Sequence, residues 1–195
     1  PSAPSKSSEY DSPPMKLIGR GRLDMKGRPV LYGSSDLETC IHECRVSAED
    51  DIFVATLSPT KPLHLLDLTA LLCESDEVTE FESLDLAVHM LFLAGRHSYR
   101  ISRSIAEATR LAGYDGLLYP SYFSLLRLGN MPFQSIYGIS LRRISEFHRY
   151  EQSMTIPNLA LFGRPLASGA VEVKSIDRLI ISKVIYDYHF GITSD

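Results

Sequence analysis

Three side chains in the sequence, those of Arg22, Glu43 and Ser121, could take part in chemistry on an anionic ligand. The planar fork of Arg22 can clamp phosphate oxygens through parallel hydrogen bonds. The carboxylate of Glu43 can accept hydrogen bonds from hydroxyl groups and stabilise a developing positive charge. The hydroxyl of Ser121 can bond a phosphate or help to place an attacking water. No Gly-x-Ser-x-Gly surrounds Ser121, so we do not expect it to be a covalent nucleophile.

Each of these residues also has an ordinary structural interpretation. Arginine usually lies on a solvated surface, and residue type alone favours that interpretation for Arg22. Glu43 could be an ordinary glutamate on the flank of a helix, and Ser121 could bond its own backbone in a turn. Cys40 and Cys44 are not followed by a second pair of ligands at a spacing typical of zinc sites. The six histidines also lack the spacing of metal ligands, so we expect no metal site.

The segment around Glu43 is predicted to be a strand followed by a helix. Residues 29–33 are typical of a short strand that ends at a glycine. Ser35 and Glu38 fit a capping box, and an apolar stripe follows at helical spacing, formed by Leu37, Cys40, Ile41 and Cys44. Glu43 lies about 110° from the centre of this stripe at 3.6 residues per turn. Its carboxylate can therefore enter a pocket beside the helix.

The remaining elements are short strands interleaved with helices. We predict strands at residues 52–57, 63–68, 117–119, 158–162, 170–173 and 179–190, and helices at 83–94, 99–112 and about 141–150. The apolar face of the helix at 99–112 is predicted to comprise Ile101, Ile105, Ala108 and Ala112, with Gly113 at its C′ position. Arg142, Arg143 and Arg149 are expected on a solvated face. The irregular alternation favours a mixed α+β domain over a doubly wound sheet.

Composition narrows the range of partners. The chain has 195 residues, a net charge of -4 and a pI of about 5.9, so it lacks the basic footprint that nucleic-acid binding favours. No signal peptide is visible, and the longest apolar stretch, at residues 84–94, is too short to cross a membrane. Three cysteines give no disulfide framework and favour a reducing compartment. Residues 1–14, rich in serine and proline, are expected to form a mobile tail or linker.

Several segments together resemble the RES-domain family. They are Gly21-Arg22 with residues 27–32, the helix at 36–43, residues 99–107 running on to 113–121, the strand at 158–162 and the closing run 176–190. The most specific of them ends in Gly-Tyr-Asp-Gly-Leu-Leu-Tyr-Pro-Ser at residues 113–121. The resemblance covers about residues 19–191.

The resemblance implies which residues form the site. The family is named for an arginine, a glutamate and a serine, which match Arg22, Glu43 and Ser121 as catalytic residues. Tyr32 matches a further tyrosine, so Arg22, Tyr32 and Ser121 are implied to contact the substrate. Arg20 is the alternative to Arg22. Tyr32 could pack on nicotinamide or bond phosphate, or it could be a core aromatic residue of its strand.

The resemblance also implies a fold and an activity. The fold is a single ADP-ribosyltransferase-like domain over residues 15–195, with a twisted mixed or antiparallel sheet, flanking helices and an extended insertion at 122–157. The activity is that of a toxin that splits the nicotinamide–ribose bond of NAD by glycohydrolysis or phosphorolysis. NAD is then the substrate, inorganic phosphate could be a co-substrate, and no cofactor or metal is needed.

Two other functions remain open at this point. The chain could transfer ADP-ribose from NAD to a protein, or it could be a non-catalytic module that binds a partner through residues 122–157. The family further implies a neutralising antitoxin or immunity protein as a partner, with no role for nucleic acid or membrane. The expected location is cytoplasmic, in the producing cell or in a target cell, because that is where NAD is available.

Overall fold

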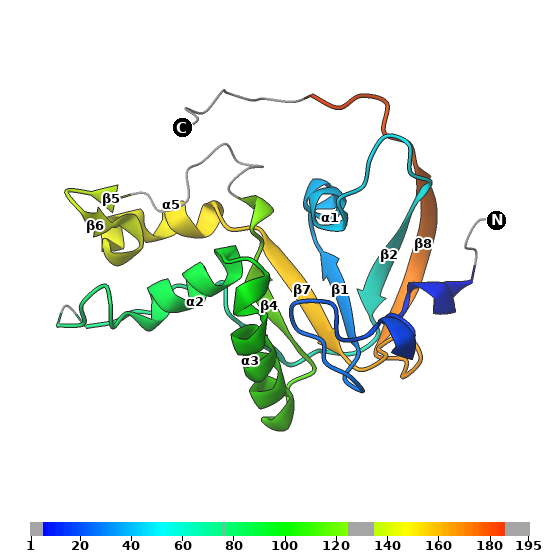
Figure 1. Ribbon diagram of the computed structural model, residues 1–195, viewed down its shortest axis with the longest axis horizontal. Coiled ribbons are helices and arrows are strands. Elements are labelled where there is room, and N and C mark those ends of the chain that lie inside the picture. The colour runs from blue at the N-terminus through cyan, green and yellow to red at the C-terminus, as the bar shows by residue number, and fades with distance from the viewer. Residues whose placement is uncertain (1–5, 76, 125–134, 186–195) are drawn as a thin grey trace, which may run out of the picture.

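A four-stranded mixed sheet lies at the centre of the computed structural model, which describes residues 6–75, 77–124 and 135–185 (Figure 1). Across the sheet the strands are β1 (Val30–Ser34), β7 (Pro157–Phe162), β4 (Gly116–Pro120) and β3 (Leu65–Asp67). Only β3 and β4 are parallel; the other two pairs are antiparallel. The predicted α+β class with a mixed sheet and flanking helices is confirmed.

A separate antiparallel pair is formed by β2 (Ile52–Pro59) and β8 (Val171–Leu179), which lies across the sheet from α2 and α3 in Figure 1. The strand predicted at 170–173 is the start of β8, whereas the separate strand predicted at 179–190 was wrong over its described residues. One strand runs to Leu179, residues 180–185 form no strand, and 186–190 lie outside the described residues. Residues 174–179 are mostly polar, but a strand in an exposed pair is held by its backbone ladder and needs no apolar face.

Three helices surround this framework: α1 (Leu37–Cys44), α2 (Leu84–Leu93) and α3 (Tyr99–Leu111). Ser83 caps α2 as predicted, by accepting a hydrogen bond from the Leu86 N–H. The predicted capping box of α1 was wrong, because its cap is Asp36, whose carboxylate accepts from the Thr39 N–H at 2.7 Å. No helix in the described part of the chain is long and apolar enough to cross a membrane.

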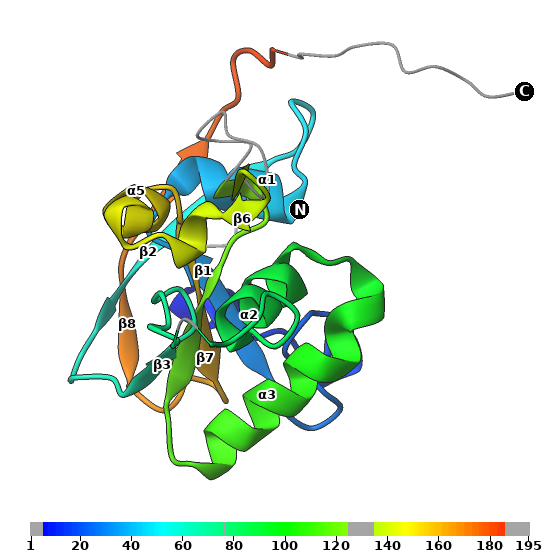
Figure 2. The same cartoon turned by 90° about the vertical axis from the view of Figure 1, so that its left-hand side faces the viewer.

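The buried face of α3 differs from the predicted one. Ser102, Ala106 and Thr109 are buried, whereas Ile101 and Ala108 are exposed. Small side chains let α3 pack against β4, on the face of the sheet that is turned to the viewer in Figure 2. The buried hydroxyls of Ser102 and Thr109 bond backbone carbonyls. The adjacent core consists of Leu23, Val30, Phe92, Ala106, Leu117, Tyr119 and Ala160.

The predicted insertion at 122–157 contains a short hairpin and a chain of small helices, with residues 125–134 outside the described part. The elements are β5 (Ser135–Ile136), β6 (Ile139–Ser140), the 3-10 helices η4 (Leu141–Arg143) and η5 (Ser145–Phe147), and α5 (His148–Ser153). The expectation that Arg142 is solvated was wrong. It is buried and forms a bidentate ion pair with Asp85 of α2 at 2.7 and 3.0 Å.

The N-terminal segment, which precedes β1, packs against the rest of the domain. It contains the 3-10 helices η1 (Ser7–Tyr10) and η2 (Met15–Leu17). Between them, Ser12 donates to the Gly163 carbonyl, and Arg164 donates to the Ser12 and Pro13 carbonyls. These hydrogen bonds tie the last residues of the expected tail to the turn after β7. Residues 1–5 lie outside the described part.

Candidate active site

Glu43 is held by one side chain of β7 and by one that directly follows the neighbouring strand β4. It lies in the last turn of α1, where its Oε1 accepts hydrogen bonds from the Ser121 hydroxyl at 2.7 Å and the Asn158 amide at 2.6 Å. Asn158 belongs to β7, opposite Tyr119 of β4, and Ser121 directly follows β4. Within the described residues no hydrogen bond reaches Oε2. One carboxylate oxygen is therefore fixed and the other is available to a ligand.

Ser121 is buried, and its hydroxyl is already engaged. Its proton goes to Glu43, and its oxygen accepts from the Phe123 N–H at 3.1 Å. The backbone N–H of Ser121 is also bound, to the Ile156 carbonyl. The structure thus brings Ser121 and Glu43 together, in an arrangement where Ser121 orients the carboxylate and is not among the residues that line the cleft.

A cleft of about 770 Å³ opens beside Glu43. Its polar and aromatic lining includes Arg20, Arg22, Tyr32, Glu43, Arg45, Arg96, Tyr99, Tyr119, Tyr122, Phe123 and Asn158. Of the described residues that line it, Glu43 alone carries a carboxylate, whereas four carry a guanidinium. A cavity of this size and character suits a small anionic ligand with flat rings.

The guanidinium of Arg22 is bound to the end of α2. It donates to the Leu91 and Ala94 carbonyls at 3.1 and 3.0 Å and lies 5.0 Å from the ring centre of Tyr99. A cation at a helix C-terminus is favourable because it meets unpaired carbonyls and the negative end of the helix dipole. Arg22 therefore fixes the wall of the cleft as well as contributing positive charge to it.

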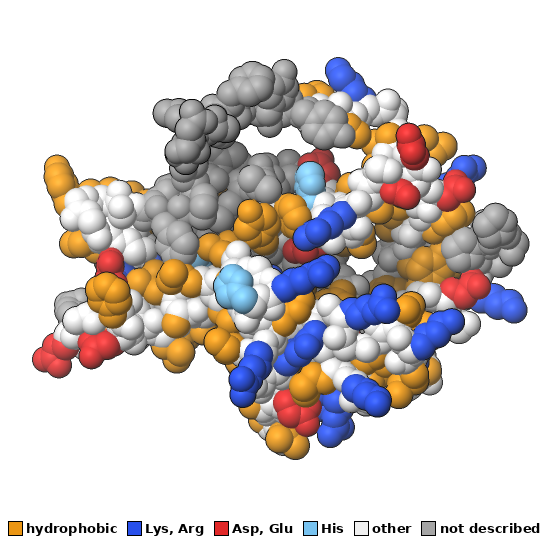
Figure 3. Space-filling view, in the orientation of Figure 1, with side chains coloured by type: hydrophobic (Ala, Val, Ile, Leu, Met, Phe, Trp, Pro, Cys, Tyr) orange, Lys and Arg blue, Asp and Glu red, His pale blue; other side chains and the backbone are white. Residues whose placement is uncertain are grey.

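Three further arginines on the cleft, Arg20, Arg45 and Arg96, are exposed and have no side-chain hydrogen bond or ion pair among the described residues. Arg45 is the C-cap residue of α1 and has a positive φ of 53°, which is unusual for a residue other than glycine. In Figure 3, lysine and arginine side chains gather across the face between α3 and the N-terminal segment. These free guanidinium groups are available to bind phosphate oxygens.

Tyr32 and Asp24 hold the loop that carries Arg20 and Arg22. The Tyr32 hydroxyl accepts from the Leu23 N–H at 2.9 Å and donates to the buried Asp24 carboxylate at 3.1 Å. Burial, reinforced by the nearby charge of Asp24, raises the pKa of Tyr32 well above its usual value. Its hydroxyl is therefore occupied, while the residue as a whole is 37% exposed and lines the cleft, where its ring can pack against a ligand.

Two cysteines on the cleft are poor candidates for chemistry. Burial raises the pKa values of Cys40 and Cys44, which keeps both thiols protonated at neutral pH, and the thiolate is the reactive form. Within the part of the chain that the structure describes, no group of three His, Cys, Asp or Glu side chains could hold a metal ion.

Sequence reasoning missed three residues of this site: Arg45, Arg96 and Asn158. Asn158 carried a usable signal, because it is a polar residue in the otherwise apolar strand Pro-Asn-Leu-Ala-Leu-Phe and is buried. Arg45 lies two residues after Glu43, but in the sequence it indicates only the end of a helix and not a binding residue. Arg96 had no local signal, because its place on the cleft depends on tertiary packing.

Comparison with known proteins gives one match. A family model described as "RES domain" matches residues 4–127, more than half of the chain and a range that contains Arg22, Tyr32, Glu43 and Ser121. No curated protein and no solved structure matches the chain.

Proposed function

The chain belongs to the RES-domain family, and on this premise we propose that it cleaves the nicotinamide–ribose bond of NAD. The observation that carries the proposal is the carboxylate of Glu43, fixed through one oxygen by Ser121 and Asn158 beside a cleft lined with arginine and tyrosine. The ADP-ribosyltransferase-like character of the domain is part of the same proposal.

The lining of the cleft suits the parts of this substrate. NAD has an anionic pyrophosphate, and Arg20, Arg45 and Arg96 offer free guanidinium groups that can bind its oxygens in bidentate fashion. Nicotinamide is a flat ring, and the exposed ring face of Tyr32 offers it a packing surface. The free Oε2 of Glu43 can accept hydrogen bonds from the hydroxyls of the nicotinamide ribose.

The reaction needs little acid catalysis. When the C1′–N bond breaks, its electron pair goes to the pyridinium nitrogen, so nicotinamide leaves as a neutral molecule and the positive charge moves to the ribose. The carboxylate of Glu43 stabilises this oxocarbenium-like sugar electrostatically. Attack by water then gives ADP-ribose, with loss of a proton to solvent, and attack by inorganic phosphate gives ADP-ribose phosphorylated at C1′.

A timed digestion of NAD by purified protein, with and without inorganic phosphate, tests the proposal. Nicotinamide with ADP-ribose in both reactions identifies a glycohydrolase, whereas phosphorylated ADP-ribose that forms only with phosphate identifies a phosphorylase. Adenine-labelled NAD reveals the remaining route, because label attached to protein means ADP-ribosyl transfer. Intact NAD in every reaction of a folded sample contradicts the proposal.

A further inference from the structure

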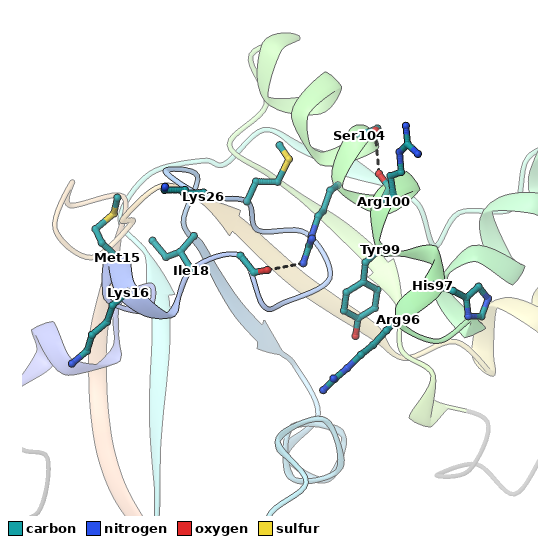
Figure 4. A pocket seen from close by; sticks show the side chains of 12 residues that line it. Met15, Lys16, Ile18, Lys26, Arg96, His97, Tyr99, Arg100 and Ser104 are labelled. Atoms are coloured by element: carbon teal, nitrogen blue, oxygen red, sulfur yellow. Dashed lines mark hydrogen bonds between the residues drawn. The ribbon is translucent and has the colours of Figure 1, made fainter.

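A second hollow, of about 910 Å³, lies next to the cleft (Figure 4). One side is formed by the N-terminal segment with Met15, Lys16 and Ile18, and the other by residues between 96 and 104, which lie just before α3 and in its first turns. We refer to this hollow as the basic groove. Its volume falls within the range of sites for small molecules.

Apart from the phenol of Tyr99, the titratable side chains that line the basic groove are all of basic type. They are Lys16, Lys26, Arg96, His97, Arg100 and Arg103. Arg103 is engaged, since it donates to the Gly19 and Gly21 carbonyls at 2.7 to 3.2 Å. Among the described residues no carboxylate pairs with Lys16, Lys26, Arg96 or Arg100. Because this chain is acidic overall, such a concentration of unpaired cations favours an anionic ligand.

The basic groove adjoins the cleft that contains Glu43. Arg96 and Tyr99 line both hollows, and the loop at residues 19–22 lines the groove with Gly19 and the cleft with its next three residues. Arg96 belongs to the 3-10 helix η3 (Arg96–Ser98), Tyr99 is the first residue of α3, and in Figure 4 their side chains extend toward the same region. A ligand whose phosphates lie at Arg96 can therefore extend from the cleft into the groove.

We propose that the basic groove binds a phosphate monoester on the adenosine half of the dinucleotide, so that the chain cleaves the 2′-phosphorylated dinucleotide, NADP, in preference to NAD. This inference rests on the proposed function, because it assigns the second half of the same ligand. Near neutral pH such a monoester carries a charge close to -2, whereas NAD has a neutral hydroxyl at that position. Unpaired lysine and arginine side chains discriminate between the two by charge-assisted hydrogen bonds.

The test compares the two dinucleotides as substrates and their cleavage products as ligands. Binding of ADP-ribose and 2′-phospho-ADP-ribose is measured by calorimetry, and kcat/KM is measured for NAD and NADP. For the wild type we expect NADP, and likewise 2′-phospho-ADP-ribose, to be favoured by about tenfold, the effect of one charge-assisted contact. The double variant Lys26→Ala/Arg100→Ala is expected to lose this preference while kcat/KM for NAD stays within about twofold, since neither residue lines the cleft.

Two control variants separate the groove from general charge effects. Lys26→Arg/Arg100→Lys keeps both charges and is expected to keep most of the preference. Lys61→Ala removes an exposed charge elsewhere on the surface and is expected to leave the preference unchanged. Lys26 and Arg100 are themselves exposed and unpaired, so their removal is not expected to unfold the protein.

Free inorganic phosphate is the other anion with phosphate chemistry that the basic groove could bind. If the double variant raised the phosphate concentration needed for NAD cleavage and left the NADP preference intact, the groove would hold a co-substrate and the proposal would be overturned. Equal binding of both products by the wild type would also overturn it, while cleavage of NAD would leave the proposed function standing. If the protein neither bound nor cleaved either dinucleotide, the proposed function itself would fail.

Discussion

At the scale of single residues, the candidate site depends on how Glu43 is held. The two hydrogen bonds to Oε1 leave Glu43 exposed yet fixed in direction, which is what an electrostatic stabiliser of a sugar cation requires. Ser121 and Asn158 act through Glu43, so they are positioning residues. Their contribution should disappear once the carboxylate is gone.

A double-mutant cycle checks this relation between Ser121 and Glu43. We expect Glu43→Gln to lower kcat for NAD cleavage by about 10²–10³, the effect of one group that stabilises a transition state. Ser121→Ala should cost about tenfold, because the carboxylate loses one of its two anchors. The double variant should be no slower than Glu43→Gln alone; additive losses would mean that Ser121 acts on the substrate independently.

The candidate site residues could be identified from the sequence, but their hydrogen-bond partners could not. Glu43 was predicted beside the apolar stripe of its helix, and that position follows from helical geometry alone. That Arg22 would bond the carbonyls of α2 could not be predicted, since these carbonyls lie about seventy residues away in the sequence. The burial of Ser121 likewise depends on the partners that tertiary packing brings to it.

At the scale of elements, the loop at residues 19–24 is what places the arginines on the cleft. Arg103 of α3 holds its carbonyls, Asp24 accepts from the Gly19 N–H, and Tyr32 holds the Leu23 N–H. Gly21 packs so closely here that a side chain on it would overlap the Asp24 carboxylate and the Tyr32 hydroxyl. The loop therefore has little freedom to shift.

Gly21→Ala tests the importance of this packing. We expect the variant to remain folded with a melting temperature lowered by several degrees, a loss of about 1–3 kcal/mol. KM for the dinucleotide should rise, because Arg20 and Arg22 move with the loop. Gly33→Ala is the matched control for stability, since a Cβ there meets open space. Equal melting temperatures for both variants would argue against a rigid loop.

The ion pair of Asp85 and Arg142 joins α2 to the 3-10 helix η4. Both side chains are 7% exposed, and Asp85 also accepts from the Leu72 N–H. Arg142→Ala would leave a buried carboxylate without its counter-ion, so we expect a loss of about 3–5 kcal/mol in the free energy of unfolding. Urea denaturation measures this, with Arg143→Ala as the control. An effect of Arg142→Ala no larger than that of Arg143→Ala would contradict the structural role.

Element positions were predicted better than their contacts. Strands β1, β3, β4 and β7 and helices α2 and α3 follow local patterns of apolar residues, caps and glycines. The buried face of α3 was wrong because small polar residues such as Ser102 and Thr109 can be buried when their hydroxyls bond nearby carbonyls. Arg142 was placed on the surface because its partner is 57 residues away in the sequence.

At the scale of the whole molecule, stability should depend on pH through His89 of α2. Burial and the positive charge of Arg142 lower its pKa from 6.5 to about 4, with Asp85 opposing them. The unfolded chain therefore binds more protons than the folded one between these values. The contribution of His89 to the free energy of unfolding is fully present above about pH 6.5. It is lost as the pH falls toward 4, by on the order of 3 kcal/mol in total.

His89→Gln isolates this contribution. Urea denaturation between pH 4 and 7 should show a steeper loss of stability on acidification for the wild type than for the variant. Glu151 acts in the opposite direction, because burial raises its pKa, but it is present in both proteins and cancels in the comparison. Parallel pH profiles would show that His89 titrates normally in the folded state.

The site as a whole is a product of the fold. The N-terminal loop, β1, α1, the α2–α3 junction and the ends of β4 and β7 each contribute lining residues to one cleft. A sequence pattern can indicate each of these elements separately, but not that they converge. The family resemblance supplied that link for Arg22, Tyr32, Glu43 and Ser121, and it did not extend to Asn158, Arg45 or Arg96.

The most direct measurement is the release of nicotinamide from NAD by the wild-type protein and by Glu43→Gln, with both samples shown to be folded. Because glutamine keeps an oxygen that can accept from Ser121 and Asn158, the variant removes charge with little change of shape. We expect steady release by the wild type and a rate lower by about 10²–10³ for the variant. Equal rates, or no release by the wild type, would contradict it.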